Sequence, residues 1–227
     1  TEASPAHYLV QPDWHEDQRL SCEKQTLGLY LTGHPIERYL EELGRFVTAR
    51  IVDLKPTNDQ TVVVAGLIIA MRSMNTKRGD RMAFITIDDR SARIELAVFS
   101  ESYQRYRDQL AKDKLIVVEG EVSVDEYSGG YKMSARSIYD INQAREHFAR
   151  KLILEVDEQR AANGFIKELQ STLAPFREGG CPVSLAYLRD GARAEIALGE
   201  AWRVHPTDEL IHRLKEVMGD GQVRMVY

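Results

Sequence analysis

Three basic residues in one short polar stretch are the strongest candidates for binding chemistry in this sequence. Lys77, Arg78 and Arg81 lie within residues 73–81, between two runs that are rich in aliphatic and β-branched residues. Cations gathered in a connecting loop can bind the phosphates of a nucleic acid. The same residues could also be ordinary solvated charges. The elements on either side of the loop decide between these interpretations.

Aromatic and further basic residues follow along the chain near this loop. Exposed rings can stack with bases, at about 1–3 kcal/mol per base. Besides the three loop cations, the candidates for nucleic-acid contact are Phe84, Arg93, Phe99, Tyr127, Tyr131, Lys132 and Arg136. Core packing is an equal alternative for Phe84 and Phe99 while the strand register is open. The basic residues among them could equally be normal outward-facing residues of half-exposed strands.

Five strand-like runs and one helix-like run follow one another through the middle of the chain. The expected strands are 61–72, 82–88, 92–99, 115–124 and 131–141, with a helix at 100–110. Ile94, Leu96 and Val98 alternate with outward residues, as in a strand with one core face. Gly66 predicts a bulge or a tight bend of a small closed barrel. This order is the plan of an OB-fold, whose second and third strands and loops commonly bind single-stranded nucleic acid. The barrel therefore favours the phosphate-binding interpretation of the loop.

The residues on either side of the barrel predict two further units. The N-terminal part predicts helices near 16–31 and 36–43 and a short strand near 46–54. The C-terminal part has the order strand, helix, strand, strand, helix, strand, which matches a ferredoxin-like βαββαβ domain. We therefore expect an α+β multidomain protein with an N-terminal helical segment (1–58), a five-stranded OB-fold β-barrel (59–142) and a C-terminal α/β domain (143–227).

The other reactive side chains form no catalytic pattern. The pairs Asp88–Asp89 and Asp125–Glu126 consist of consecutive residues, whose side chains point to opposite faces of a strand and cannot by themselves clamp a metal. The six histidines are scattered, and the sequence has no GxxxxGK[ST] phosphate-binding loop. We expect no catalytic residue, no metal and no cofactor in this sequence.

The composition limits how a nucleic acid could be bound. The 227 residues carry a net charge of -5, which is unlike a generally basic nucleic-acid binder. Residues 61–142 hold 12 basic and 12 acidic residues, so affinity must come from local clustering and should depend on salt. No apolar run approaches the roughly 20 residues that span a bilayer. The widely separated Cys22 and Cys181 indicate a reduced, cytoplasmic setting. The polar N-terminus without an initiator Met indicates a processed protein or an excised fragment.

Several dispersed motifs carry a family resemblance. They are LGLYLTGHP at 27–35, TKRG at 76–79, DDRSARIE at 88–95, SGG at 128–130 and WRV at 202–204. In this order they resemble the C-terminal region of the alpha subunit of bacterial replicative DNA polymerase III, from the end of its fingers region to its last domain. The resemblance runs through nearly the whole chain.

The resemblance implies a division of labour within the polymerase. DNA-directed DNA synthesis belongs to the whole protein, with its metal-binding aspartates in a palm region upstream. The OB domain is associated with single-stranded DNA template, and the final domain with the tau subunit of the clamp loader. The family's sliding-clamp motif normally precedes the Leu-Gly-x-Tyr-Leu string, and residues 1–27 contain no good copy. Contact with the sliding clamp therefore has no motif to support it here.

Two other functions stay open at this point. An OB barrel can bind RNA, as in the anticodon-binding domains of some aminoacyl-tRNA synthetases, or the chain could be a purely protein-binding scaffold. In the C-terminal unit we expect partner contact at Trp202, Leu210 and Leu214. Tryptophan is enriched in interface hot spots. A role as a core anchor is the alternative for Trp202.

Overall fold

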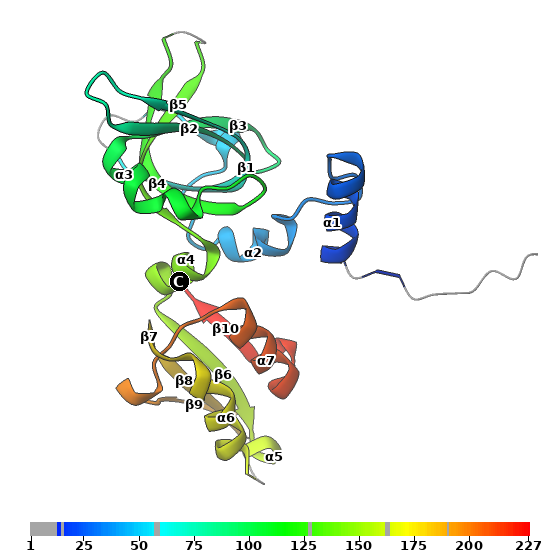
Figure 1. Cartoon of the computed structure of the whole chain (residues 1–227). Coiled ribbons are helices and arrows are strands. Elements are labelled where there is room, and N and C mark those ends of the chain that lie inside the picture. The colour runs from blue at the N-terminus through cyan, green and yellow to red at the C-terminus, as the bar shows by residue number, and fades with distance from the viewer. Residues whose placement is uncertain (1–12, 15, 57–59, 127–128, 162–163, 190) are drawn as a thin grey trace, which may run out of the picture.

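A computed structural model describes residues 13–14, 16–56, 60–126, 129–161, 164–189 and 191–227 (Figure 1). The helices are α1 (Glu16–Leu27), α2 (Leu40–Leu43), α3 (Ser100–Tyr106), α4 (Ile141–Phe148), α5 (Glu158–Ala161), α6 (Phe165–Leu173) and α7 (Asp208–Met218). The strands are β1 (Val62–Asn75), β2 (Arg81–Asp88), β3 (Arg93–Val98), β4 (Leu115–Val124), β5 (Tyr131–Tyr139), β6 (Lys151–Asp157), β7 (Arg177–Cys181), β8 (Val183–Arg189), β9 (Ala192–Ala197) and β10 (Val223–Val226). Short 3-10 helices are η1 (Glu37–Tyr39), η2 (Ile51–Asp53), η3 (Arg107–Gln109), η4 (Ala174–Phe176), η5 (Glu200–Trp202) and η6 (Asp220–Gln222). None of the helices in these ranges is long and apolar enough to cross a membrane.

The first five strands close into a barrel in the order β1-β2-β3-β5-β4. Its interior is filled by alternate aliphatic side chains, and Ile94, Leu96 and Val98 are buried as predicted. Parallel pairing of β3 with β5, centred on Leu96 and Met133, closes the ring. The predicted OB-fold barrel is therefore confirmed.

The long strand β1 pairs with different neighbours along its two halves. Residues 62–67 of β1 pair with β4, and from Leu67 onward the strand pairs with β2. Gly66 lies just before this change of partner, where a Cβ would meet the Asp88 carbonyl oxygen at 3.0 Å. The β1–β2 ladder also has an irregularity between Ile68 and Ala70. The bend predicted from Gly66 thus lies where the backbones of β1 and β2 approach closely, and a side chain at this position would prevent that approach.

The C-terminal domain is a four-stranded sheet in the order β10-β6-β8-β9. Helices α6 and α7 cover one face of this sheet, and Leu154, Leu169 and Leu214 meet in its core (Figure 1). The predicted order of elements is present, but the ferredoxin-like strand arrangement is not confirmed, because β6 and β8 are direct parallel neighbours. A split βαβ unit needs another strand between them.

Strand β9 explains the difference. All six of its residues are exposed, so it cannot occupy the central position that a split arrangement requires. Its charged residues lie over the open face of the sheet, where Arg193 contacts Glu155 (3.0 Å) and Glu195 contacts Lys151. An alternation of small and charged residues is typical of an edge strand.

The N-terminal segment differs from the prediction in two places. Helix α1 ends at Leu27, and Gly28 takes a left-handed conformation with φ 75°. The prediction of a strand near 46–54 is wrong, because backbone N–H groups of this segment donate to side chains instead of to a neighbouring strand. The Ile51 N–H donates to Asp89 (2.8 Å) and the Val52 N–H donates to Ser91 (3.2 Å).

A buried arginine joins the three parts of the chain. Arg145 lies on α4, between the barrel and the C-terminal domain (Figure 1), and its side chain is 4% exposed. It donates two hydrogen bonds to Glu42, at 2.6 and 2.8 Å, and lies 2.7 Å from an Asp208 oxygen. The Tyr39 hydroxyl donates to the other Asp208 oxygen (2.7 Å). Burial raises the pKa of Tyr39 to about 12, so this proton stays in place.

Replacing Arg145 by Ala should lower the free energy of unfolding by about 3–5 kcal/mol, because the partly buried carboxylates of Glu42 and Asp208 would both lose the buried cation that they face. Urea denaturation measures the loss. Arg105→Ala is the matched control, since its ion pair with Glu101 is 3.6 Å long and exposed. That control should change stability by about 0.5 kcal/mol or less. Equal losses in the two variants would contradict the structural role of the junction.

Candidate nucleic-acid interface

The three predicted loop cations lie together at the tip of the β1–β2 hairpin. The Thr76 N–H donates to the Asp80 carbonyl (2.7 Å), and Gly79 makes the turn with φ 88°. Lys77, Arg78 and Arg81 are all exposed, and none of them forms an ion pair with another residue of the described ranges. The loop therefore presents three positive charges to solvent against the single exposed carboxylate of Asp80.

Strand register settles the position of Phe84. Along β2, Ala83, Ile85 and Ile87 point into the barrel, so Phe84 lies on the outer face. The Arg72 guanidinium lies 4.5 Å from the centre of the Phe84 ring and contacts Glu95 at 3.2 and 3.3 Å. Phe84 is thus outside the core, as the binding interpretation requires, but Arg72 covers one face of its ring.

The strand cations that were expected to extend the positive surface all face carboxylates. Arg93 donates to Asp88 at 2.8 Å, and Lys132 lies 3.6 Å from Asp125. Arg136 contacts Glu121. Burial of Asp88 opposes ionisation, but the Arg93 hydrogen bond and charge hold the pKa of the Asp88 carboxyl below its usual value. These three strand cations are therefore neutralised, whereas the loop cations are not.

Apolar side chains surround the tips of the two long hairpins. Tyr131 is 46% exposed and pairs across the β4–β5 hairpin with Val124, which is 51% exposed. Met71 and Met74 are similarly exposed on β1, which runs three residues beyond its predicted end. Sequence reasoning missed these methionines, although the alternation in residues 73–75 continues the strand. Both hairpins project from the barrel away from the C-terminal domain (Figure 1).

Of the other two predicted aromatic residues, Phe99 lies within the described part of the chain and Tyr127 does not. Phe99 is 53% exposed and lies between β3 and α3. Tyr127 lies outside the described residues. The acidic pair at the β2–β3 turn has a structural use, because Asp89 accepts hydrogen bonds from the Ser91 and Ala92 N–H groups.

The predicted partner contacts separate into two groups. Leu210 and Leu214 are fully buried in the core of the C-terminal domain, so the prediction that they contact a partner is wrong. The apolar stripe of α7 that indicated a docking surface packs on the domain's own sheet. Trp202 is partly exposed, and the Arg177 guanidinium lies 5.2 Å from its ring centre.

Comparison with known proteins covers almost the whole chain. Residues 168–219 match the family described as DNA polymerase III subunit alpha, C-terminal domain, and residues 62–141 match the OB-fold nucleic acid binding domain. The chain is 45% identical over 221 residues to DNA polymerase III subunit alpha of Vibrio cholerae, and 42% identical over 222 residues to that of Escherichia coli K12. Each alignment covers 97% of this chain and 19% of the relative. The chain thus spans about a fifth of the length of these relatives.

Two solved structures align with a part of the chain. The SSB domain of a Synechococcus protein is 10% identical, with a TM-score of 0.33, and the alignment covers 37% of this chain and 99% of that domain. A domain of replication protein A from Methanococcus maripaludis is 16% identical, with a TM-score of 0.34, and the alignment covers 41% of this chain and 93% of that domain.

Removing the carboxylates that neutralise the barrel wall should increase affinity for oligo-dT. The double variant Glu95→Gln and Glu121→Gln frees Arg72 and Arg136 while keeping the side-chain shapes. Two freed cations should make the slope of log K against log salt concentration more negative by about 1.4. Fluorescence anisotropy titrations at several salt concentrations measure this slope. Glu158→Gln with Glu209→Gln makes the same charge change on the C-terminal domain, where these carboxylates face Arg189 and Arg213. An equal gain in both double variants would show that only net charge matters.

Proposed function

Because the chain belongs to the DNA polymerase III alpha-subunit family, we propose that its barrel holds single-stranded DNA template while the whole polymerase synthesises DNA. One observation carries this proposal. Lys77, Arg78 and Arg81 lie at the tip of the β1–β2 hairpin and form no ion pair within the described ranges. This hairpin and the β4–β5 hairpin, with its exposed apolar side chains, both project from the barrel away from the C-terminal domain (Figure 1). Phosphates would bind the cations, and unpaired bases would lie against Tyr131 and the methionines.

The surface fits a single strand better than a duplex. Stacking on exposed rings requires bases that are not already paired and stacked within a duplex. A net charge of -5 and a neutralised barrel wall give no broad positive surface of the kind that covers duplex phosphates. The RNA-binding alternative is not favoured, because the relatives that match 97% of this chain are DNA polymerase subunits.

The C-terminal domain is proposed to dock the tau subunit of the clamp loader, and the chain is proposed to work in the cytoplasm. Two observations support a separate docking role. The domain has a hydrophobic core of its own, and residues 168–219 match the family model of the alpha subunit's C-terminal domain. Trp202 is the proposed centre of the contact, because it is partly exposed beside Arg177. Tryptophan and arginine are both enriched in interface hot spots.

Replacing Lys77, Arg78 and Arg81 together by Ala should weaken oligo-dT binding between about tenfold and a hundredfold near 0.1 M salt. The loss of three phosphate contacts should also reduce the salt slope by about 2. Anisotropy titrations at several salt concentrations measure both effects.

The control for this variant is Arg160, Lys167 and Arg224 replaced together by Ala. These three cations are also exposed and form no ion pair within the described part of the chain, but they lie on the C-terminal domain. Their replacement should leave the affinity and the slope nearly unchanged. A loop variant that behaves like this control would remove the proposed phosphate contacts.

Trp202→Ala should reduce binding of the tau subunit at least tenfold, as expected for a hot-spot residue. Circular dichroism first establishes that the domain still folds, and surface plasmon resonance then measures affinity. Ile196→Ala removes another exposed apolar side chain of the same domain and serves as the control. Undiminished tau binding by folded Trp202→Ala would assign this tryptophan to packing alone.

A further inference from the structure

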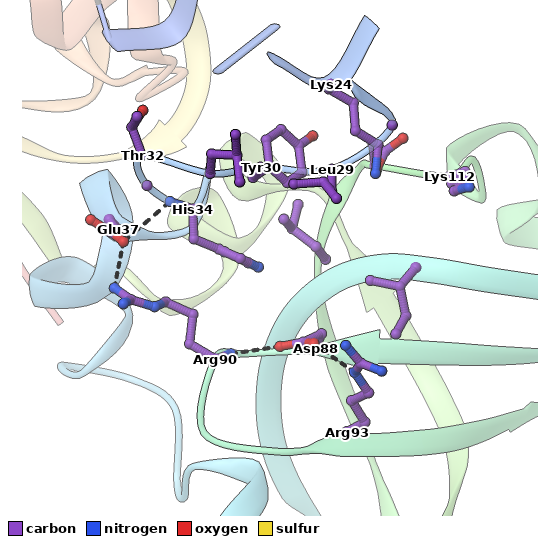
Figure 2. Close-up of a pocket in the computed structure, with 16 residues that line it drawn as sticks. Lys24, Leu29, Tyr30, Thr32, His34, Glu37, Asp88, Arg90, Arg93 and Lys112 are labelled. Carbon is purple, nitrogen blue, oxygen red and sulfur yellow. Dashed lines mark hydrogen bonds and ion pairs between the residues drawn. The ribbon is translucent and has the colours of Figure 1, made fainter. Parts of the chain in front are cut away.

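A pocket of about 550 Å³ lies between the N-terminal segment and the barrel (Figure 2). One wall is formed by residues 28–34, which belong to the LGLYLTGHP motif. The opposite wall is formed by the ends of β2 and β3 and the loop between them, together with Lys112 and Asp113 from the loop before β4. The proposed contact between the loop cations and DNA makes no use of this pocket.

The motif wall is held rigidly by one carboxylate. Glu23 accepts hydrogen bonds from the N–H groups of Leu31 (2.8 Å) and Thr32 (3.1 Å) and from the Thr32 hydroxyl (2.6 Å). Lys24 lies 4.8 Å from the Tyr30 ring centre and forms an ion pair with Asp113 at 3.0 Å. Lys24 thus links the Tyr30 ring on the motif wall to Asp113 on the opposite wall.

The pocket is lined by both apolar and charged side chains, and its charges sum to a net positive value. Its charged lining consists of Lys24, Glu37, Asp88, Arg90, Arg93, Lys112 and Asp113, which are four cations and three carboxylates. Each carboxylate is matched by one cation: Asp113 by Lys24, Glu37 by Arg90 and Asp88 by Arg93. Lys112 is exposed and forms no ion pair with any residue whose position is described. One positive charge is therefore left for an anionic ligand.

A hydrogen-bond donor also faces this space. The Ile36 N–H donates to His34 Nδ1 (3.3 Å), so the neutral ring carries its proton on Nε2. Burial lowers the pKa of His34, which favours that neutral form. Figure 2 shows His34 on the motif wall, facing Asp88, Arg90 and Arg93 across the pocket.

The pocket is continuous with the outer face of the barrel. Asp88 lies on the same side of β2 as Phe84, and Arg93 lies on the same side of β3 as Glu95. Strand β2 runs from the cationic loop at Arg81 to the pocket at Asp88, a length of about 23 Å at roughly 3.3 Å per residue. One extended single strand could cover both ends, within the site sizes of roughly 4–16 nucleotides known for OB-folds.

We propose that this pocket binds one nucleotide of the same single-stranded DNA, with its phosphate at Lys112 and its base between Tyr30 and the aliphatic wall. This inference rests on the proposed function of the barrel. Charge complementarity and continuity with the outer face of β2 and β3 select a nucleic-acid strand as the occupant. The N-terminal motif then contributes directly to DNA binding.

The test compares Lys112→Ala with Lys114→Ala, using oligo-dT of about 12 nucleotides. Both lysines are exposed, and only Lys112 lines the pocket. Lys112→Ala should weaken binding about fivefold near 0.1 M salt and reduce the salt slope by about 0.7. Lys114→Ala should leave both unchanged. In the unaltered protein, the NMR amide signal of Gly33 should shift when oligo-dT is added.

The outcomes separate this inference from the proposed function. If the triple loop variant weakens binding while Lys112→Ala behaves like Lys114→Ala and the Gly33 signal does not move, the pocket proposal is wrong and the loop proposal stands. If neither the loop variant nor Lys112→Ala weakens binding, both proposals are wrong. If Lys112→Ala alone weakens binding and the Gly33 signal shifts, the pocket binds DNA and the loop proposal is wrong.

Discussion

Barrel closure by the short parallel pairing of β3 with β5 is the constraint on which the arrangement of functional groups depends. Only three residue pairs, from Glu95 with Lys132 to Ala97 with Ser134, join these strands. Closure fills the interior of the described barrel with aliphatic side chains. Any chemistry must therefore lie on the outer wall or on the hairpins that extend past it. The β1–β2 and β4–β5 hairpins do extend past it, and they carry the three loop cations and several exposed apolar side chains.

The distribution of charge then determines how the surface can work. On the wall, Arg72, Arg93 and Arg136 each face a carboxylate, so they contribute little long-range field. The loop cations face no such partner among the described residues, so their attraction for an anion is local to the hairpin tip. Binding of this kind is weak for each contact and strongly dependent on salt. Arg145 links Glu42 of the N-terminal segment to Asp208 of the C-terminal domain. Its helix α4 also packs on the barrel through Ile141 and Ala144, so the three parts of the chain meet at this junction.

The sequence predicts local structure well where a regular hydrophobic pattern decides it. The alternation in residues 93–98 gave the correct inward face of β3, and the five barrel strands lie where the pattern placed them. Contacts between residues far apart in the sequence could not be predicted from this pattern. The carboxylate partners of Arg93 and Arg136 follow from register and from the β4–β5 ladder. The stripe with Leu210 and Leu214 could face either a partner or the domain's own sheet, because periodicity gives a helix an apolar face without naming what covers it. The pocket beside the LGLYLTGHP motif needs segments about 60 residues apart, so no local pattern predicts it.

An unpaired DNA strand is proposed to lie along the hairpin tips and the outer face of β2 and β3. Amide chemical shifts of the isotope-labelled chain, followed while oligo-dT is titrated in, would locate this strand. We expect shifts concentrated in residues 74–82, 84–93 and 129–132, with little change in β6, β8 and α7. Shifts confined to the C-terminal sheet and its helices, with unchanged hairpin signals, would rule this binding surface out.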